Sequence, residues 1–177
     1  MNKRVLVAYA TKCGSTAEVA DVIGHVLREA GEAVDVRNVE DIQDLKPYGA
    51  VVLGSAIRMG KPLPAASRFV RQHRAALAEM PVALFSVGTT MNEDTPEHRA
   101  TAQECLASLT KAVQPVSVGL FGGKVDLAAL SPFWRFATSF IKEEDLDSGD
   151  HRNWQAIRLW ANTLIPLLNK VSQPTGD

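Results

Sequence analysis

Val5-Leu6-Val7-Ala8-Tyr9-Ala10-Thr11-Lys12-Cys13-Gly14-Ser15-Thr16, close to the amino terminus, is the stretch that decides the fold. Its first six residues form a continuous apolar run, which is typical of a strand buried on both faces of a parallel sheet. After Thr16, apolar residues recur at spacings of three and four as far as Ala30, and Gly31 ends the expected helix. The stretch therefore predicts a strand, a short polar loop and a helix.

The loop between this strand and this helix has the chemistry of an anion site. Amides at a helix start and the positive end of the helix dipole attract phosphate groups. Thr11, Ser15 and Thr16 add hydroxyl donors, and Gly14 lets the backbone approach a ligand closely. Ser15 and Glu18 also have the spacing of a capping box. We interpret the loop as a phosphate site; the alternative is a polar turn and helix cap with no ligand.

The rest of the chain alternates between apolar runs and helical patterns. Further strands are expected over residues 33–36, 50–53, 81–87 and 115–121, and further helices over 64–77, 95–113 and 150–168. This alternation predicts a doubly wound α/β fold, with a five-stranded parallel sheet and helices on both faces. Ligands of such sheets bind beyond the carboxyl ends of the strands, so the candidate site lies in the loops after residues 10, 53, 87 and 121.

Length and composition exclude several classes of protein. The 177 residues suit a single domain over 1–170, with an insertion at about 122–149 and a flexible tail at 171–177. A net charge of −1 argues against nucleic-acid binding, and 46% hydrophobic residues argue against disorder. No apolar run approaches the ~20 residues of a membrane span. The two cysteines, Cys13 and Cys105, indicate a reduced, cytoplasmic protein, with Cys105 expected in the core.

Three stretches together resemble a known family. Residues 9–16 look like the FMN-phosphate loop of flavodoxins, although Cys13 stands where many flavodoxins have threonine. Residues 54–61 and 150–157 are similar to the flavodoxin-like protoporphyrinogen oxidases that use menaquinone. The resemblance implies FMN as cofactor and the flavodoxin strand order 2-1-3-4-5, with FMN where the order reverses. It also implies that reducing equivalents pass from protoporphyrinogen IX to a quinone.

The resemblance and the topology together predict three groups of cofactor-binding residues. The phosphate group is Thr11, Lys12, Cys13, Gly14, Ser15 and Thr16; the flavin-ring groups are Ser55, Ala56, Ile57, Arg58, Met59, Gly60 and Lys61 after the third strand, and Val87, Gly88, Thr89 and Thr90 after the fourth. Arg58 and Lys61 occur without an acidic neighbour, and a cation near the ring would stabilise the anionic reduced flavin. The alternative for these two side chains is exposure to solvent.

The insertion is rich in aromatic residues. Phe133, Phe136 and Phe140 recur at helical spacing, which predicts a short amphipathic helix. Such a helix could cover the sheet edge, form an apolar lid over a large flat substrate, or contact a membrane surface at the inner face of the membrane. The acidic run over 142–147 argues against electrostatic anchoring to anionic lipids.

The remaining residues point to no second chemistry. The four histidines are scattered without metal-binding spacing, and no side chain is identified as a catalytic acid or base. The leading interpretation is an FMN-dependent oxidoreductase acting on a porphyrinogen, a quinone or both, with a redox protein as a further partner. The alternatives are a diffusible flavodoxin electron carrier and a non-enzymatic flavodoxin-like binding module.

Overall fold

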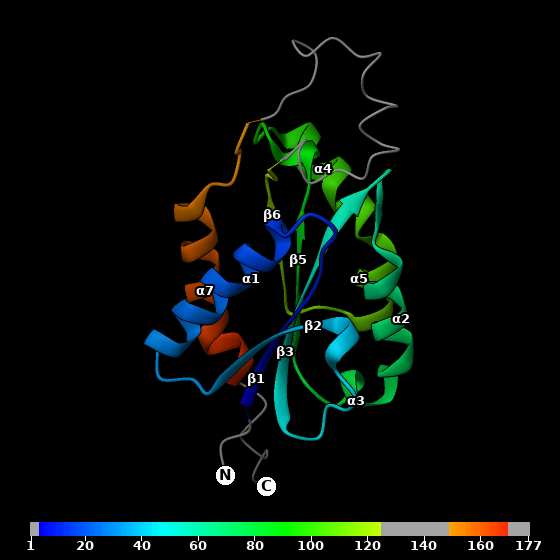
Figure 1. Ribbon diagram of the computed structural model, residues 1–177, viewed down its shortest axis with the longest axis vertical. Helices are drawn as coiled ribbons and strands as arrows, with labels where there is room; N and C mark the ends of the chain where they lie inside the picture. The colour runs from blue at the N-terminus through cyan, green and yellow to red at the C-terminus, as the bar shows by residue number, and fades with distance from the viewer. Residues whose placement is uncertain (1–3, 125–148, 170–177) are drawn as a thin grey trace, which may run out of the picture.

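The computed structural model describes residues 4–124 and 149–169, which form a mostly parallel sheet between two layers of helices (Figure 1). The long strands are β1 (Arg4–Ala10), β2 (Val34–Asn38), β3 (Tyr48–Arg58), β5 (Val82–Val87) and β6 (Ser117–Phe121). They lie in the order β2-β1-β3-β5-β6, and every pair in this order is parallel. Counted among the long strands, this is the order 2-1-3-4-5, so the flavodoxin-like fold is confirmed. The two-residue strand β4 (Lys61–Pro62) pairs antiparallel with β3 and was not expected.

The helices cover both faces of the sheet. The helices α1 (Ser15–Glu29) and α7 (Trp154–Asn169) pack together on one face. The other face carries α2 (Pro64–Gln72), α3 (Arg74–Ala78), α4 (Pro96–Cys105) and α5 (Ala107–Val113). Side chains alternate along each strand, so Val5 and Val7 pack toward α1 and α7 while Leu6 and Ala8 pack on the opposite side. The apolar run of the first strand is thus buried on both faces, as its composition predicts.

In the centre of the sheet, β3 and β5 approach each other closely at one pair of residues. Gly54 of β3 lies beside Phe85 of β5 in the strand register, and both residues are buried. A Cβ atom on Gly54 would lie 2.0 Å from the Cζ atom of Phe85. The phenyl ring therefore fills the space that a side chain at position 54 would need.

Several expected boundaries are wrong. The helix expected over 64–77 is divided at His73 into α2 and α3, and the helix expected over 95–113 is divided at Leu106 into α4 and α5. The last helix starts at Trp154 rather than near residue 150. The third strand continues to Arg58 instead of ending before Gly54, so part of the expected ring loop is strand.

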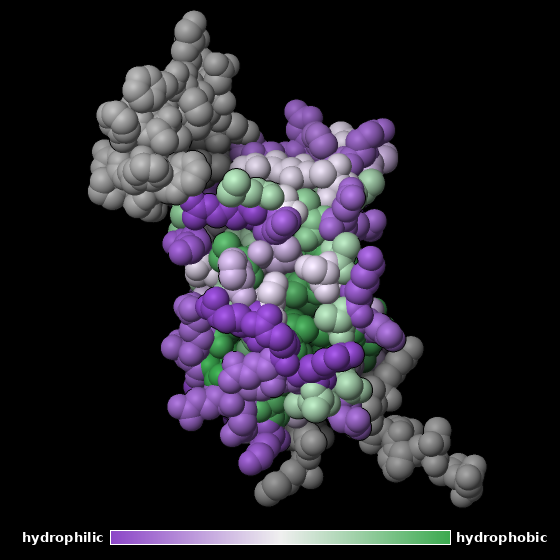
Figure 2. All heavy atoms as spheres, turned by 90° about the vertical axis from the view of Figure 1, so that its right-hand side faces the viewer, coloured by the Kyte–Doolittle hydropathy of each residue, from purple (hydrophilic) through white to green (hydrophobic). Residues whose placement is uncertain are grey.

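The face formed by α2, α3 and α5 is largely polar. In Figure 2 hydrophilic side chains cover much of this face, with smaller apolar areas between them. Arg71, Arg74 and Lys111 are among its exposed residues. Within the residues described, no helix is both long enough and apolar enough to cross a membrane.

Candidate functional site

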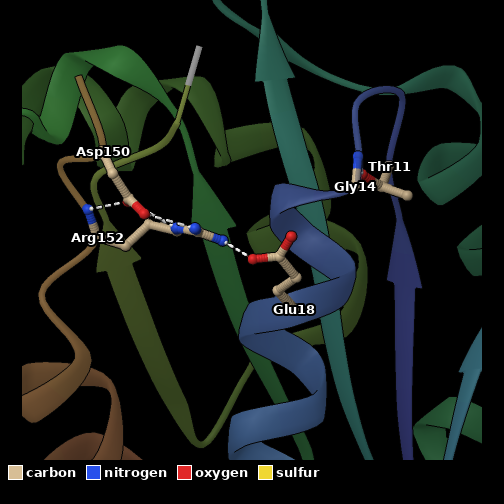
Figure 3. A network of polar contacts seen from close by, with 5 residues as sticks. All are labelled: Thr11, Gly14, Glu18, Asp150 and Arg152. Carbon is tan, nitrogen blue, oxygen red and sulfur yellow. Dashed lines mark hydrogen bonds and ion pairs between the residues drawn. The ribbon is translucent and has the colours of Figure 1, made fainter. Parts of the chain in front are cut away.

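The loop after β1 has the geometry of an anion site. Gly14 adopts a left-handed conformation with φ of 90°, and its amide donates to the Thr11 hydroxyl at 3.0 Å (Figure 3). The first helical bond of α1 runs from the Glu18 amide to the Gly14 carbonyl at 3.1 Å. Since the first amides of a helix have no partner within it, Ser15, Thr16 and the next residue present donors at this end. The expected Ser15–Glu18 capping box is wrong, because Gly14 is the cap residue and no side chain of the described residues caps α1.

Thr16 provides the test of whether this loop fits a phosphate group. Its side chain is completely buried, and its Oγ1 atom has no hydrogen-bond partner among the described residues. Buried hydroxyls are nearly always paired, and one left unpaired costs about 1–3 kcal/mol. An unpaired hydroxyl at the start of α1, beside amides without helical partners, fits a bound phosphate oxygen.

The predicted ring residues 55–61 form a hairpin rather than an open loop. Ile57 pairs with Pro62 and Arg58 pairs with Lys61, so Met59 and Gly60 make a two-residue turn. Both turn residues have positive φ, 50° for Met59 and 72° for Gly60, which is the combination that a type I′ turn requires. The Met59 side chain is 87% exposed, so an apolar group stands out from the carboxyl edge of the sheet.

The two cations of the hairpin lie opposite each other. Arg58 and Lys61 are exposed cross-strand neighbours at the last pair before the turn. Like charges in this arrangement repel, so the contact between these two side chains does not itself stabilise the hairpin. The Ser55 side chain differs from these residues, because it is buried and its hydroxyl is committed to hydrogen bonds within the protein.

The loops after β5 and β6 meet at the same edge. The Gly88 amide donates to the Phe121 carbonyl at 3.1 Å, and a Cβ on Gly88 would lie 3.1 Å from the Cβ of Ile57. After Val87 and Gly88, a 3₁₀ turn over Thr89–Met91 leaves Thr89 exposed and Thr90 half-buried. Topology thus brings all three predicted groups to one end of the sheet, where doubly wound folds bind their ligands.

A buried arginine, Arg152, links the segment that precedes α7 to the first turn of α1 (Figure 3). Arg152 donates through Nε and Nη2 to both carboxylate oxygens of Asp150, at 2.7 and 2.6 Å, and through Nη1 to Glu18. Only 4% of the Arg152 side chain is exposed, and its Cζ atom lies 4.5 Å from the centre of the Trp154 ring. Arg152 could not be identified as a site residue from the sequence alone, because its partner Glu18 lies 134 residues away in the chain.

The electrostatics of this network follow from the pairing. The Arg152 guanidinium lowers the pKa of the Asp150 carboxyl to about 2, chiefly through their side-chain hydrogen bonds. The pKa of Arg152 is raised, first by the hydrogen bonds to Asp150 and then, against the effect of burial, by Glu18. Asp150 and Arg152 are therefore both charged at neutral pH.

The remaining residues that the sequence singled out lie in different environments. Lys12 and Cys13 are exposed at the loop tip, while Cys105 is only partly buried and so is not the core residue that was expected. The described residues contain no group of three or more His, Cys, Asp or Glu side chains arranged to hold a metal ion. Phe133, Phe136 and Phe140 lie outside the described residues, as do the tail at 171–177 and nearly all of the insertion.

A cavity of about 880 Å³ opens at the opposite edge of the sheet. Tyr48, His73 and Leu168 are among its lining residues, and the Nε2 atom of His73 is buried without a hydrogen-bond partner in the described chain. This edge holds the amino ends of the parallel strands. It is therefore not the edge at which doubly wound folds bind their ligands.

Curated relatives match almost the whole chain. The protoporphyrinogen IX dehydrogenase [quinone] of Escherichia coli (strain K12) is 26% identical over 178 residues, which cover 94% of this chain and 97% of the relative. The Leishmania major protein of the same name is 28% identical over 197 residues, covering 98% of this chain and 83% of the relative.

Solved structures support the fold. A flavodoxin from the domain Archaea has a TM-score of 0.57 at 17% identity, covering 96% of this chain and 99% of that one. Oxidised Flavodoxin 2 from Bacillus cereus has a TM-score of 0.55 at 19% identity, covering 93% and 99%.

The family model described as "Flavodoxin domain" matches residues 6–152, which include all three predicted groups. This match confirms FMN, the cofactor that the resemblance implies. With this match and its strand order, the chain belongs to the flavodoxin domain family.

Proposed function

We propose that this protein is an FMN-dependent oxidoreductase that oxidises protoporphyrinogen IX and passes the reducing equivalents to a quinone. The observation that carries the proposal is the nearly end-to-end match with relatives named protoporphyrinogen IX dehydrogenase [quinone]. The loop after β1 and the exposed β3–β4 hairpin lie at the same edge of the sheet, and this supports the proposal. If the loop holds the phosphate of the cofactor, the hairpin lies close to its flavin ring.

The phosphate end of the cofactor would be held by the start of α1. The unpaired Thr16 hydroxyl and the amides that follow Gly14 supply hydrogen bonds to the phosphate oxygens. Cys13 is a poor hydrogen-bond donor. Backbone amides and the hydroxyls of Thr16 and Ser15 would therefore contribute more to phosphate binding than they would in a protein with threonine at position 13. The Thr11 hydroxyl shapes the loop by accepting from Gly14.

The ring end would lie against the β3–β4 hairpin and the turn that follows Gly88. When bound, FMN supplies the two-electron redox chemistry, and the chain binds and orients it. Arg58 and Lys61 give this edge a positive potential, which favours a reduced, anionic ring. Met59 offers a polarizable, exposed contact for a flat apolar substrate. Gly88, Thr89 and Thr90 would line the other side, whereas the predicted site residue Val87 has its side chain buried in the core.

Anaerobic turnover tests this function directly. FMN-loaded protein is mixed with protoporphyrinogen IX under nitrogen, with and without menadione as acceptor, and porphyrin fluorescence is followed. We expect fluorescence to rise only when both FMN and the quinone are present. A protein that binds FMN and exchanges electrons with a reductase, yet never oxidises the porphyrinogen, would instead be an electron carrier.

The proposed effect of the hairpin cations on the flavin is tested by measuring the reduction potential of bound FMN, not by measuring turnover. Arg58→Glu should lower the two-electron reduction potential of bound FMN, because it replaces a positive charge near the ring by a negative one. Arg71→Glu makes the same charge change on α2, away from the proposed ring edge, and serves as the matched control. Spectroelectrochemistry that finds equal potentials for Arg58→Glu and the wild type would place Arg58 away from the ring.

A further inference from the structure

The first turn of α1 carries a negative charge where the cofactor phosphate would bind. Glu18 is joined by its amide to the Gly14 carbonyl, so its Cα lies within one helical turn of the phosphate loop. Its carboxylate side chain is 59% exposed and adds to the charge of Asp150 on the same side. Carboxylates near an anion site disfavour a phosphate dianion, and this repulsion acts over a Debye length of ~8 Å in physiological salt.

Arg152 places one positive charge between these carboxylates. It contacts Glu18 and both oxygens of Asp150, and its side chain is almost fully buried. Its backbone is fixed too, because its amide donates to the Asp150 carboxylate at 3.2 Å and the neighbouring His151 amide donates to the Gly123 carbonyl at 3.1 Å. The guanidinium is therefore held at this position before any ligand arrives.

We propose that Arg152 is a specificity-determining, positioning residue for the phosphorylated cofactor: by offsetting one of the two negative charges of Glu18 and Asp150 beside the start of α1, it lets the site bind FMN in preference to riboflavin. The proposal rests on the phosphate site proposed above. It assigns to Arg152 an electrostatic role toward the phosphate, with no contact between the guanidinium and the reacting ring.

The formal charges of these three side chains predict the order of FMN affinity among variants. The wild-type trio of Glu18, Asp150 and Arg152 carries a net charge of −1. Arg152→Gln makes it −2, Glu18→Gln makes it 0, and the double variant restores −1. FMN affinity should therefore be highest in Glu18→Gln, similar in the wild type and the double variant, and lowest in Arg152→Gln. Riboflavin has no phosphate, so its affinity should stay nearly constant.

The experiment measures dissociation constants of FMN and riboflavin by quenching of flavin fluorescence, for the wild type and these three variants. We expect Arg152→Gln to lower the ratio of FMN to riboflavin affinity roughly tenfold, and the double variant to recover it to within about threefold of wild type. Arg152→Lys keeps the charge and should retain most of the selectivity. In ~1 M NaCl the differences among the charge variants should shrink, because the Debye length falls to ~3 Å.

Arg4→Gln is the matched control, since Arg4 also makes a two-point contact with a carboxylate, that of Asp35, at the amino end of β1. It should leave the ratio unchanged. Equal loss of FMN and riboflavin in Arg152→Gln, without recovery in the double variant, would show a merely structural role and overturn the proposal. A wild-type protein that binds both flavins equally would instead refute the phosphate site itself.

Discussion

The amide of Leu63 donates a hydrogen bond of 2.9 Å to the hydroxyl of Ser55, across the base of the β3–β4 hairpin. The same hydroxyl donates at 2.8 Å to the carbonyl of Ala56. Ser55 is completely buried, so a single side chain joins the strand that enters the hairpin to the residue that leads into α2. This hydroxyl therefore helps to hold the residues that follow β4 against the end of β3.

Ser55→Ala should destabilise the protein. The substitution leaves the buried Leu63 amide without its acceptor, and an unpaired buried donor costs about 1–3 kcal/mol. Urea unfolding of the FMN-free protein measures the change in the free energy of unfolding. Ser108→Ala, at an exposed position of α5, is the control and should change it by less than about 0.5 kcal/mol. Equal stabilities for Ser55→Ala and wild type would contradict the importance of this bond.

Thr16→Ala should separate cofactor binding from stability. Because the Thr16 hydroxyl has no partner among the described residues, its removal breaks no hydrogen bond there, and alanine has the higher helix propensity. The FMN-free variant should therefore melt within a few degrees of the wild-type temperature, because the buried methyl group that is also lost offsets the gain in helix propensity. FMN should bind roughly tenfold to a hundredfold more weakly, from the loss of a hydrogen bond to a charged group worth ~1.5–3 kcal/mol, while riboflavin binding changes little.

Thr101→Ala is the control for that prediction, because Thr101 lies on the exposed side of α4. Titration of both flavins and thermal melts of both variants suffice. Equal losses of FMN and riboflavin affinity in Thr16→Ala would remove Thr16 from the phosphate site.

Met59→Asn should stabilise the hairpin and impair the reaction. A non-glycine side chain with positive φ is unfavourable, and asparagine tolerates this conformation better than methionine. The melting temperature should rise, whereas the Michaelis constant for the porphyrinogen or the quinone should increase several-fold through loss of the apolar contact. Kinetics and melts on one FMN-loaded preparation measure both. A stabilised variant with unchanged kinetics would show that Met59 contacts no substrate.

The ion pair between Asp150 and Arg152 should make the free energy of unfolding depend on pH in the acid range. The pKa of Asp150 is about 2 in the folded protein, below its ordinary value of 3.8. A lowered folded-state pKa contributes stability above the unfolded-state pKa, and this contribution is lost as pH falls from about 4 to about 2. Asp150→Asn should therefore make the free energy of unfolding less dependent on pH in this window. Asp21→Asn, which alters an exposed carboxylate on α1, should leave the slope there close to that of wild type.

The sequence allowed the sheet and the loop between its first strand and first helix to be predicted, because both depend on local patterns. Continuous apolar runs such as Val5–Ala10 identify buried strands without any knowledge of their neighbours. The hairpin could not be found this way, because Met59-Gly60 lacks the usual Asn-Gly or Asp-Gly turn signal and Arg58 reads as a loop residue.

Other errors arose from interactions between distant parts of the chain. The Ser15–Glu18 capping box had correct spacing, yet Gly14 caps the helix and the Glu18 carboxylate is paired with Arg152. Apolar periodicity continued across His73 and Leu106, so it concealed the breaks between α2 and α3 and between α4 and α5. Periodicity shows which side faces the core, but it does not show where a helix is interrupted.

The interlocking of Gly54 and Phe85 restricts the order in which these two positions can change during evolution. A side chain at position 54 requires that the ring at 85 shrink first, because the two would occupy the same space. That first step leaves a cavity and costs about 3–5 kcal/mol, a large share of the stability of a typical domain. Descendants of this chain should therefore keep both residues or replace both, and lineages with only one replacement should be rare.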